Sequence, residues 1–444
     1  MDISQIIPQF GGAAFTILAF VVALSIIVAI HEYGHYIVGR WSGIDAEVFS
    51  LGFGPVLYSR VDKRGTKWQI AALPFGGYVK FLGDANAASV GANADIREMD
   101  KRRTMLGAPL WARAATVAAG PFFNFALSFL IFALVILSEG QARDPLTVSE
   151  LRALPADYVQ ELEPGDEVLA IDGRPAPSLE EFDDFLDTLP LEATLEYRVR
   201  RDGEERVVQG PYPYPPVILG LNPQSAAMDV DLAVGDVILS INGTDIRTFE
   251  ELRQIVGASD GGPLALEVWR DGEVLDFTLV PRSVDLPRPE GGFETRYLIG
   301  ISGGLFFEAE TESLGLLASL GYGAAQVWFI ITSSLDGLWH MITGAISTCN
   351  LSGPVGIAET SGAMASQGPL DFIWFVAVLS TAVGMLNLFP VPILDGGHLV
   401  FHAYEAVRGK PPSDAALRVL MAAGLSVLLT LMLFALANDL FLCP

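Results

Sequence analysis

Cysteine is scarce in this chain: Cys349 and Cys443 are the only two among 444 residues. Because they lie far apart in the sequence, they predict neither a disulfide framework nor a thiolate metal site. Charged residues are also few, at 18% of the chain, while apolar residues make up 51%. This composition is unlike that of an ordinary soluble protein and favours a membrane protein.

Runs without any Asp, Glu, Lys, Arg or His occur at 3–30, 114–138, 372–394 and 419–438. Each run is long enough to cross roughly 30 Å of hydrocarbon as a helix. The N-terminus has neither a basic segment nor a small-residue cleavage site before its apolar run. We therefore expect a retained helix there and not a removed signal peptide.

Lysine is absent from residues 139–315, which carry 13 Arg against 36 Asp and Glu, a net charge of −23 within the −25 of the whole chain. A block this acidic excludes a nucleic-acid partner, whose phosphates require the opposite sign. Residues 40–113 carry 11 Lys and Arg against 7 Asp and Glu. By the positive-inside rule, this segment and the loop 396–418 are cytoplasmic, so the acidic block and both termini lie outside.

The acidic block contains an internal repeat. Residues 164–173 are echoed by 234–243, offset by 70 residues, and the Arg-Asp-Gly-Glu turn at 201–204 returns at 270–273. Each copy has the pattern of a strand, an Asp-Gly or Asn-Gly turn, a short helix and a hairpin. The sequence therefore predicts two small β-rich domains in tandem.

The two repeated units resemble the PDZ domains of bacterial proteases, and the second unit, with 222–227 followed by 232–236, resembles them most. PDZ domains bind peptides by adding a strand to a sheet edge and by capturing a terminal carboxylate. The first unit lacks the Pro-x-Ser-Ala-Ala stretch before Gly165. A steric or spacer role is therefore an equal alternative for the first unit.

Residues 48–82 alternate apolar and polar side chains between glycine-rich segments. This pattern predicts a β-hairpin or small sheet against the cytoplasmic face of the membrane. A simple tie between helices is the alternative. If the sheet forms, its edge strand could hold an unwound peptide segment by β-addition.

The motif that points to chemistry is H-E-x-x-H at 31–35. On a helix, His31 and His35 share one face and can grip a single Zn²⁺, while Glu32 lies beside them and can take a proton from an attacking water. These ionisable residues end an uncharged run of 28 residues, where burying each one costs roughly 2.5–3.5 kcal/mol. We interpret them as functional, the alternative being a polar cluster just past the helix end.

A catalytic zinc site needs a third protein ligand, with water in the fourth position. We expect Asp395 to be that ligand, because 372–394 brings it to the depth of His31 if both helices cross in the same direction. His398 is the alternative. The candidates for the third ligand in the C-terminal part of the chain are Asp336, His340, Glu359, Asp371, Asp395, His398, His402 and Glu405.

A fifth apolar stretch, 313–335, is also long enough to cross a membrane. A crossing there would reverse 372–394 and put Asp395 on the wrong side from His31. We therefore expect 313–347 to form helices that lie on or dip into the outer interface, interrupted by glycines. The expected fold is an α-helical integral membrane protein with four transmembrane helices, a cytoplasmic membrane-associated β-hairpin or sheet, and two tandem β-rich PDZ domains.

The motifs together resemble the site-2 protease family of intramembrane zinc metalloproteases. Residues 387–396 are similar to its N-x-x-P-x-P-x-x-D-G motif, 120–124 to its G-x-x-x-N and 74–79 to its P-x-G-G-Y-V segment. With H-E-x-x-H, four motifs occur in the family's order. The tandem PDZ units between the second and third core helices are similar to those of the members that regulate sigma-E in Gram-negative bacteria.

The resemblance implies that His31, His35 and Asp395 are zinc ligands and that Glu32 is the general base and later the general acid. It implies a bacterial enzyme of the inner membrane. That enzyme hydrolyses peptide bonds within transmembrane segments of single-span proteins. The implied substrates are an anti-sigma factor of envelope stress signalling, already trimmed outside by another protease, and remnant signal peptides.

The resemblance also implies four residues that bind substrate or shape its site. Asn124 and Asn387 are expected to hydrogen-bond the unwound substrate, with interhelical packing as the alternative for each. Pro390 and Pro392 lack an N–H and break the helix, which frees backbone and re-aims Asp395.

The predicted segments follow the chain in order. They are 1–40 (first transmembrane helix), 41–105 (cytoplasmic β segment), 106–138 (second helix), 139–210 and 217–305 (PDZ units), 306–368 (interfacial helices), 369–400 (third helix with the Asp-Gly motif) and 411–438 (fourth helix). The expected partners are single-span substrates, peptide or protein termini at the PDZ units and the lipid bilayer.

A function of another class is a non-catalytic membrane scaffold whose PDZ units bind unfolded envelope proteins. Its metal would be structural, and a closed structural site needs a fourth protein ligand. His398 is the only plausible candidate in the sequence for that fourth ligand. A structural site also has no use for a general base such as Glu32.

Overall fold

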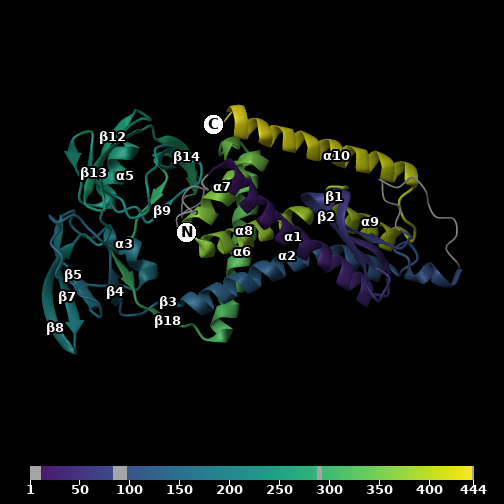
Figure 1. Ribbon diagram of the computed structural model, residues 1–444, viewed down its shortest axis with the longest axis horizontal. Helices are drawn as coiled ribbons and strands as arrows, with labels where there is room; N and C mark the ends of the chain where they lie inside the picture. The colour runs from purple at the N-terminus through teal and green to yellow at the C-terminus, as the bar shows by residue number, and fades with distance from the viewer. Residues whose placement is uncertain (1–11, 84–97, 288–292, 443–444) are drawn as a thin grey trace. The chain divides into compact units, whose positions relative to one another are not determined.

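The computed structural model describes residues 12–83, 98–287 and 293–442, which divide into two compact units. The first, here the helical unit, comprises the chain up to Val135, Leu317–Met341 and the part from Thr348 on. The second, the β-rich unit, comprises Ile136–Leu316 and Ile342–Ser347. Figure 1 shows the long helices of the first unit and the short strands of the second.

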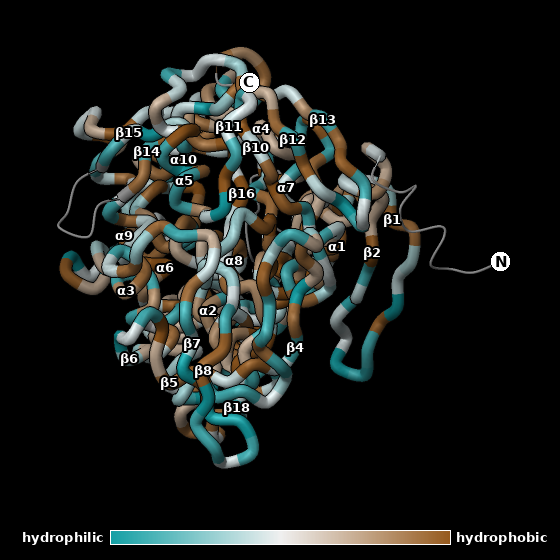
Figure 2. The backbone as a smooth tube through the Cα atoms, turned by 90° about the vertical axis from the view of Figure 1, so that its left-hand side faces the viewer, coloured by the Kyte–Doolittle hydropathy of each residue, from teal (hydrophilic) through white to brown (hydrophobic). Residues whose placement is uncertain are grey.

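Five of the described helices are long and apolar enough to cross a membrane, namely α1, α2, α6, α8 and the stretch Asp414–Leu442. Figure 2 colours the backbone by hydropathy and shows brown, hydrophobic segments near the helix labels as well as along the strands. The helices and helical turns of the helical unit are α1 (Ala13–Trp41), η3 (Glu98–Arg103), α2 (Leu110–Glu139), α6 (Leu316–Ile342), η5 (Thr348–Asn350), α7 (Pro354–Gln367), α8 (Pro369–Asn387), α9 (Asp395–Arg408), α10 (Asp414–Ala437) and the π-turn η6 (Asn438–Leu442).

Polar contacts between helices establish the directions of α1, α2 and α8. Along each pair of contacts, residue numbers on α2 rise as those on its neighbour fall, so α2 runs antiparallel to both neighbours. α1 and α8 therefore run in the same direction, as the depth argument requires. The contacts are His35 Nδ1–Thr116 O (2.8 Å), His31 Nδ1–Asn124 Nδ2 (3.3 Å), Ser128 Oγ–Ala377 O (2.7 Å) and Ser380 Oγ–Asn124 O (3.1 Å).

The expected interruption of 313–347 at its glycines is wrong, because α6 continues unbroken through Gly321, Gly323 and Gly337. A Cβ on Gly323 would lie 2.6 Å from Phe129 O, so this glycine lets α6 approach α2 closely. The other two glycines have open space around them. Each costs only about 1 kcal/mol within a helix, which does not break it. Figure 1 shows α6 running steeply across α2 and not alongside it.

The chain between α8 and α9 is not helical. α8 ends at Asn387 and α9 begins at Asp395, so the predicted third transmembrane segment, 369–400, contains two helices. Pro390 and Pro392 lie in the break. Neither has a backbone N–H to continue a helical ladder, and the break lies directly before Asp395, as the sequence predicts.

The predicted small sheet is formed by β1 (Ala46–Val61) and β2 (Lys67–Phe81), which fold back on themselves. Phe49 in the first half of β1 lies opposite Val79 on one side and Trp68 on the other, while Arg60 in the second half lies opposite Trp68. The end of β2 and the second half of β1 are therefore the two edges. The exposed large apolar side chains of this sheet are Phe53, Val56, Leu57, Tyr58, Val61, Ile70, Leu73 and Phe75.

The β-rich unit consists of two lobes with the same strand order, β6-β5-β7-β8 in the first and β11-β10-β12-β13 in the second. The internal repeat of the sequence is thus a repeated fold. The elements are β3 (Gln141–Ala142), β4 (Val148–Leu151), β5 (Glu167–Ile171), β6 (Arg174–Pro175), η4 (Leu179–Glu181), α3 (Phe182–Leu186), β7 (Thr194–Arg201), β8 (Glu204–Pro211), β9 (Gly220–Leu221), α4 (Ala226–Asp229), β10 (Val237–Ile241), β11 (Thr244–Asp245), α5 (Phe249–Gly257), β12 (Leu264–Arg270), β13 (Glu273–Leu279), β14 (Arg282–Pro287), β15 (Phe293–Leu298), β16 (Ile301–Ser302), β17 (Phe307–Ala309) and β18 (Thr311–Glu312).

The repeated charged residues form the same ion pair in both lobes. Arg201 donates two hydrogen bonds of 2.7 Å to Asp166, and Arg270 donates two of 2.6 Å to Asp236. The two aspartates are 0% and 1% exposed. A buried carboxylate needs a partner of this kind, so the repeated residues stabilise each lobe.

The second lobe is inserted into the first. β17 pairs with β4, β18 pairs with β3, and Leu305, Phe306 and Phe307 lie in the hydrophobic core of the first lobe. The chain leaves the second lobe close to its predicted end at 305, since β16 still pairs with β9. The predicted interfacial segment 306–368 needs correction at its start, because β17 and β18 are strands of the first lobe. The repeat could not reveal this return, because it joins segments far apart in the sequence.

The prediction that the cysteines form no disulfide is wrong for Cys349, which is disulfide-bonded. Cys443, the other cysteine of the chain, lies outside the described residues. Two contacts show how the fold joins this region. Asn438 Nδ2 donates to Thr348 O at 2.8 Å, and Asp439 accepts from three backbone N–H groups at the start of α7 at 2.8–3.0 Å. Separation in the sequence was a poor guide to separation in the fold.

Candidate metal centre

Three side chains from distant parts of the chain converge in the helical unit. His31 and His35 lie on α1 and Asp395 begins α9, and their ligand atoms all lie within 4.8 Å of one another. The two histidine Nε2 atoms are 3.1 Å apart, and Asp395 Oδ2 lies 3.2 Å from His31 Nε2 and 3.5 Å from His35 Nε2. No other group of three such ligands comes together in the described parts of the chain.

These distances fit a zinc ion. Zinc lies about 2.0–2.1 Å from nitrogen and oxygen ligands in a tetrahedron, which puts neighbouring ligand atoms about 3.3 Å apart. Asp395 Oδ2 is buried without a hydrogen-bond partner among the described residues. Lone pairs of two imidazoles and a carboxylate facing one point repel one another unless a cation lies between them. Three protein ligands leave one position open, the arrangement of a catalytic site.

The second nitrogen of each histidine faces α2. His35 Nδ1 lies 2.8 Å from Thr116 O, which accepts a hydrogen bond from Nδ1–H and so leaves Nε2 free to hold a metal. His31 Nδ1 lies 3.3 Å from Asn124 Nδ2, while Asn124 Oδ1 is buried without a partner among the described residues. A half-turn of the amide would let Oδ1 accept from His31 Nδ1–H. That exchange satisfies both groups and leaves His31 Nε2 free for a metal.

Glycines allow α1 and α2 to meet at the site. A Cβ on Gly120 would lie 2.3 Å from His35 Nε2 and 2.8 Å from His31 Cε1, so no side chain fits there. A Cβ on Gly34 would lie 2.6 Å from Ala119 O. Both glycines lie inside motifs of the sequence, H-E-x-x-H and G-x-x-x-N, where no role was predicted for them. A glycine within an otherwise helical motif was the available signal.

Glu32 lies on α1 between the two histidines in sequence and faces β2. Its carboxylate accepts a hydrogen bond from the backbone N–H of Val79. A Cβ on Gly77 would lie 3.1 Å from Glu32 Cγ and 3.0 Å from Val28 Cγ1, so β2 passes directly against the helix here. The P-x-G-G-Y-V segment therefore holds the carboxylate beside the metal ligands.

A bidentate ion pair ties α2 to α9. Arg113 Nη1 and Nη2 donate to the two carboxylate oxygens of Glu405 at 3.0 and 2.7 Å, and both side chains are mostly buried. Since Asp395 begins α9 and Thr116, whose carbonyl accepts from His35, lies on α2, this pair joins two helices that build the site. Glu405 was considered only as a metal ligand, and Arg113 carried no sequence signal.

The remaining predicted site residues lie outside the ligand cluster. Asn387 Nδ2 donates to Val383 O of its own helix at 3.1 Å, and Pro390 and Pro392 lie in the break before α9. His398 packs its ring against Phe401, with centroids 5.9 Å apart, and is not among the converging ligands.

Comparison with known proteins agrees with this geometry. The model of peptidase family M50 matches residues 19–431. The chain belongs to peptidase family M50, the site-2 proteases. A Rhizobium meliloti protein named as a zinc metalloprotease is 36% identical over 434 residues, covering 96% of each chain. The metalloprotease MmpA of Caulobacter vibrioides is 31% identical, covering 97% of this chain and 96% of its own. The regulator of sigma E protease of Haemophilus influenzae is 32% identical, covering 95% and 97%.

As a member of family M50, the protein is a zinc-dependent metalloprotease of the membrane. A zinc ion held by the three converging side chains would supply Lewis-acid polarisation of a peptide carbonyl and acidify a water molecule beside it. The chain supplies the rest. Glu32 offers a carboxylate for proton transfer, and α2 fixes the orientation of both imidazoles.

Proposed function

We propose that this metalloprotease hydrolyses peptide bonds within the transmembrane segments of single-span membrane proteins. The observation that carries the proposal is the position of the ligand cluster. His31 and His35 lie on α1, a helix long and apolar enough to cross a membrane, and Asp395 follows α8, another such helix, after the break that ends it. His31, which is only 9% exposed, lies well inside α1 and not in a surface loop. A peptide bond that reaches this site must come from within the membrane or be drawn into it.

In the proposed mechanism, one carboxylate, that of Glu32, moves a proton from the attacking water to the leaving amine. His31, His35 and Asp395 hold the zinc, and Glu32 takes the proton of the attacking water and later gives it to the leaving amine. The Val79 N–H contact to Glu32 orients that carboxylate. A closed structural site would need a fourth protein ligand, and none joins the three within the described residues. This supports the enzyme over the scaffold alternative.

We propose four crossings, by α1, α2, α8 and α10, in a bacterial inner membrane. α1 and α8 run in the same direction, so an even number of crossings must separate the end of α2 from the start of α8. The steep course of α6 across α2 (Figure 1) supports an interfacial position for α6. The disulfide at Cys349 supports an oxidising compartment on that side, with both termini and the β-rich unit periplasmic and 41–105 cytoplasmic.

We propose that the sheet of β1 and β2 holds the unwound substrate. Its end segment runs along α1, where Gly77 packs near Glu32 and a Cβ on Gly39 would contact Phe81. A substrate strand added to this edge would lie near the base. The exposed apolar side chains of the sheet suit a lipid or hydrophobic-peptide environment, since an apolar edge in water promotes aggregation.

We propose that the remaining polar and proline residues serve the substrate or the site. Asn387 lies at the end of α8, next to the break that contains Pro390 and Pro392, and we assign its amide to hydrogen-bonding the unwound substrate there. Asn124 has a further role, because it faces His31 and orients a zinc ligand. Both assignments can be separated by measuring zinc and cleavage independently.

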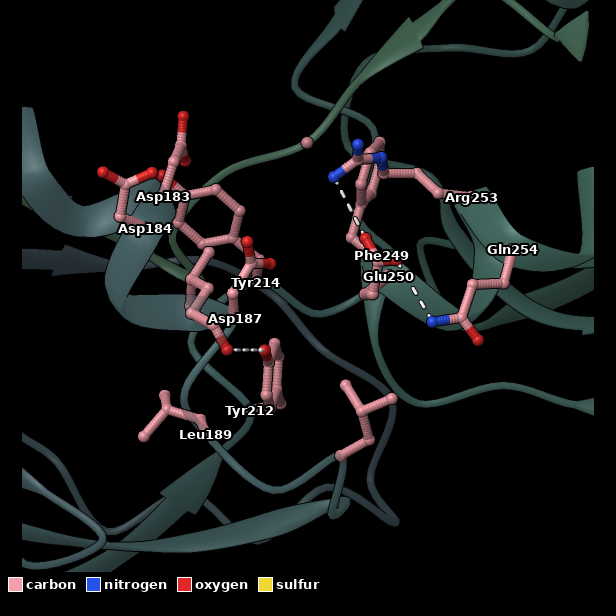
Figure 3. Close-up of a pocket in the computed structure, with 13 residues that line it drawn as sticks. Asp183, Asp184, Asp187, Leu189, Tyr212, Tyr214, Phe249, Glu250, Arg253 and Gln254 are labelled. Carbon is pink, nitrogen blue, oxygen red and sulfur yellow. Dashed lines mark hydrogen bonds and ion pairs between the residues drawn. The ribbon is translucent and has the colours of Figure 1, made fainter. Parts of the chain in front are cut away.

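We propose that the two lobes are PDZ domains that select substrates outside the membrane. Within the β-rich unit, a cleft of about 740 Å³ lies between α3 and α5 (Figure 3). Asp183, Asp184, Asp187 and Glu250 line it, and the one lining arginine, Arg253, is paired with Glu250 at 3.0 Å. This charge disfavours a terminal carboxylate and favours basic peptide segments. By kinship with the sigma-E regulator, we propose an anti-sigma factor trimmed outside as substrate, and remnant signal peptides besides.

The test uses purified protein in liposomes with two tagged single-span substrates, one with its outer domain intact and one with that domain removed. We expect cleavage of the trimmed substrate within its transmembrane segment, faster when helix-weakening residues are added there, and little cleavage of the intact one. Bound zinc without cleavage of either substrate would favour the scaffold. Cleavage confined to a soluble loop would contradict an intramembrane site.

A further inference from the structure

The elbow between α9 and α10 contains a pocket that the proteolytic mechanism does not use. α9 ends at Arg408, and Gly409 takes the left-handed conformation, with φ of 71°, that stops it. Two prolines follow, and the Ser413 side chain caps the start of α10. This short, stiff connection holds the ends of the two helices together and leaves a cavity of about 510 Å³ between them.

The walls of the pocket are of two kinds. Arg408 and Lys410 line it with exposed positive charge, and neither has an ion-pair partner among the described residues. Apolar side chains line the rest, including Phe401, Tyr404 and Leu420, the last two being 42% and 40% exposed. The Arg408 guanidinium lies 5.9 Å from the Tyr404 ring centroid, which holds the charge over the pocket.

The helix start adds to this field. α10 is 24 residues long, so the positive end of its macrodipole is directed at the elbow. Asp414, in the first turn, offsets part of that field, but it does not line the pocket. Among the residues that the structure describes, no carboxylate lines the pocket. The cavity therefore combines an uncompensated cationic rim with an apolar floor that continues onto an exposed, hydrophobic helix.

We propose that this pocket binds an anionic phospholipid, with the phosphate held by Arg408 and Lys410 and the acyl chains lying along α10. The match is one of amphipathic chemistry. An inorganic phosphate would use only the rim, and a neutral lipid only the floor. Basic pockets at the cytoplasmic ends of transmembrane helices favour anionic headgroups for the same reason. The lipid would fix the angle between α9, which begins with Asp395, and α10.

The test measures the thermal unfolding midpoint of the full-length, zinc-loaded protein in detergent as three probes are titrated. These are phosphatidylglycerol, phosphatidylcholine with the same acyl chains, and glycerol phosphate. We expect phosphatidylglycerol to raise the midpoint in a saturable way, because a ligand stabilises the state that binds it. We expect phosphatidylcholine to act weakly and glycerol phosphate not at all.

Variants locate the effect. Each basic side chain near an anionic surface contributes about a fivefold factor in affinity, so Arg408→Gln with Lys410→Gln should raise the half-saturating concentration about 25-fold. Arg408→Lys should retain most of the response. Arg418→Gln is the matched control, since this exposed cation lies on α10 outside the pocket. All these side chains are exposed, so the midpoint without lipid should not change.

Three results would overturn the proposal. The double variant could respond like the wild type, which removes the two cations from binding. Arg418→Gln could weaken the response as much as the double variant, which leaves only general surface charge. Glycerol phosphate alone could reproduce the shift, which makes the pocket a phosphate site and not a lipid site. The response of the double variant to phosphatidylglycerol, relative to Arg418→Gln, decides the matter.

Discussion

The two units of this protein use charged residues in opposite ways. In the β-rich unit, the buried ion pairs occur twice, at Asp166 and again at Asp236, and each pair stabilises its own lobe. In the helical unit, the cluster of His31, His35 and Asp395 has no repeated counterpart. Its members come from segments near opposite ends of the chain and meet at one point. The repeated ion pairs therefore support the fold, whereas the converging side chains, which have no counterpart elsewhere in the described residues, form the candidate metal centre.

Glycine shows the same contrast. In the β-rich unit, Gly173 and Gly243 adopt positive φ in equivalent turns, where a Cβ would meet no other atom. In the helical unit, Gly120 lies inside a helix and touches both histidine ligands. The first use is conformational and the second is steric. Variants can therefore separate the chemistry of one unit from the stability of the other.

The largest effect is expected at the base. Glu32→Gln keeps the size and removes proton acceptance, so cleavage should fall by at least about 10²–10⁴-fold while zinc content and folding stay unchanged. Cleavage rate and bound zinc are measured on the same preparation. Full activity in the purified variant would remove Glu32 from the mechanism.

The steric role of glycine comes next. Gly120→Ala would place a Cβ 2.3 Å from His35 Nε2, so helix or ligand must move. We expect a stability loss of about 1–3 kcal/mol together with reduced zinc binding. Gly321→Ala is the matched control, because it also lies within a helix but meets nothing within 4 Å. There we expect stabilisation by about 1 kcal/mol and normal zinc. Equal behaviour of the two variants would refute the steric role.

A smaller effect is expected from the partner of His31. Asn124→Ala removes the acceptor for His31 Nδ1–H, which should weaken zinc binding by about 10–100-fold. Asn387→Ala should slow cleavage and leave zinc affinity unchanged, because Asn387 bonds only to its own helix. A zinc titration of both variants separates them. Loss of zinc affinity in Asn387→Ala but not in Asn124→Ala would reverse the two roles.

The smallest effect on chemistry is expected in the β-rich unit. Asp236→Asn weakens the charged bonds from Arg270, which should destabilise the second lobe by about 2–3 kcal/mol. Zinc content should be normal, and a trimmed substrate should still be cleaved. Asp166→Asn should do the same to the first lobe. Reduced zinc content in either variant would show that the two units are not separable in this way.

Much of the site was predictable from the sequence because the helical pitch and the direction of the chain are local properties. The spacing of His31 and His35 places them on one helical face, and the uncharged runs favoured Asp395. The backbone carbonyl of Thr116 left no signal, since any residue type supplies one. The return of 305–309 to the first lobe and the disulfide of Cys349 also left none, because both depend on contacts between distant segments.

The continuity of α6 was missed for a different reason. Its glycines resembled breaks, but one of them serves close packing against Phe129 and the other two cost too little to interrupt a long apolar helix. The steric role of Gly120 could have been predicted in the same way, because a glycine inside a predicted helix can mark close packing and not a break.

The most direct test of the account is the zinc content of Asp395→Ala and His398→Ala after identical purification. Asp395 Oδ2 lies 3.2 Å from His31 Nε2, whereas His398 packs against Phe401. We predict that Asp395→Ala loses zinc, with an affinity loss beyond the roughly 100-fold expected when only a hydrogen-bond partner of a ligand is changed. We predict that His398→Ala keeps it. Zinc retained by Asp395→Ala and lost from His398→Ala would contradict the assignment of the third ligand, and with it the proposed four-crossing topology.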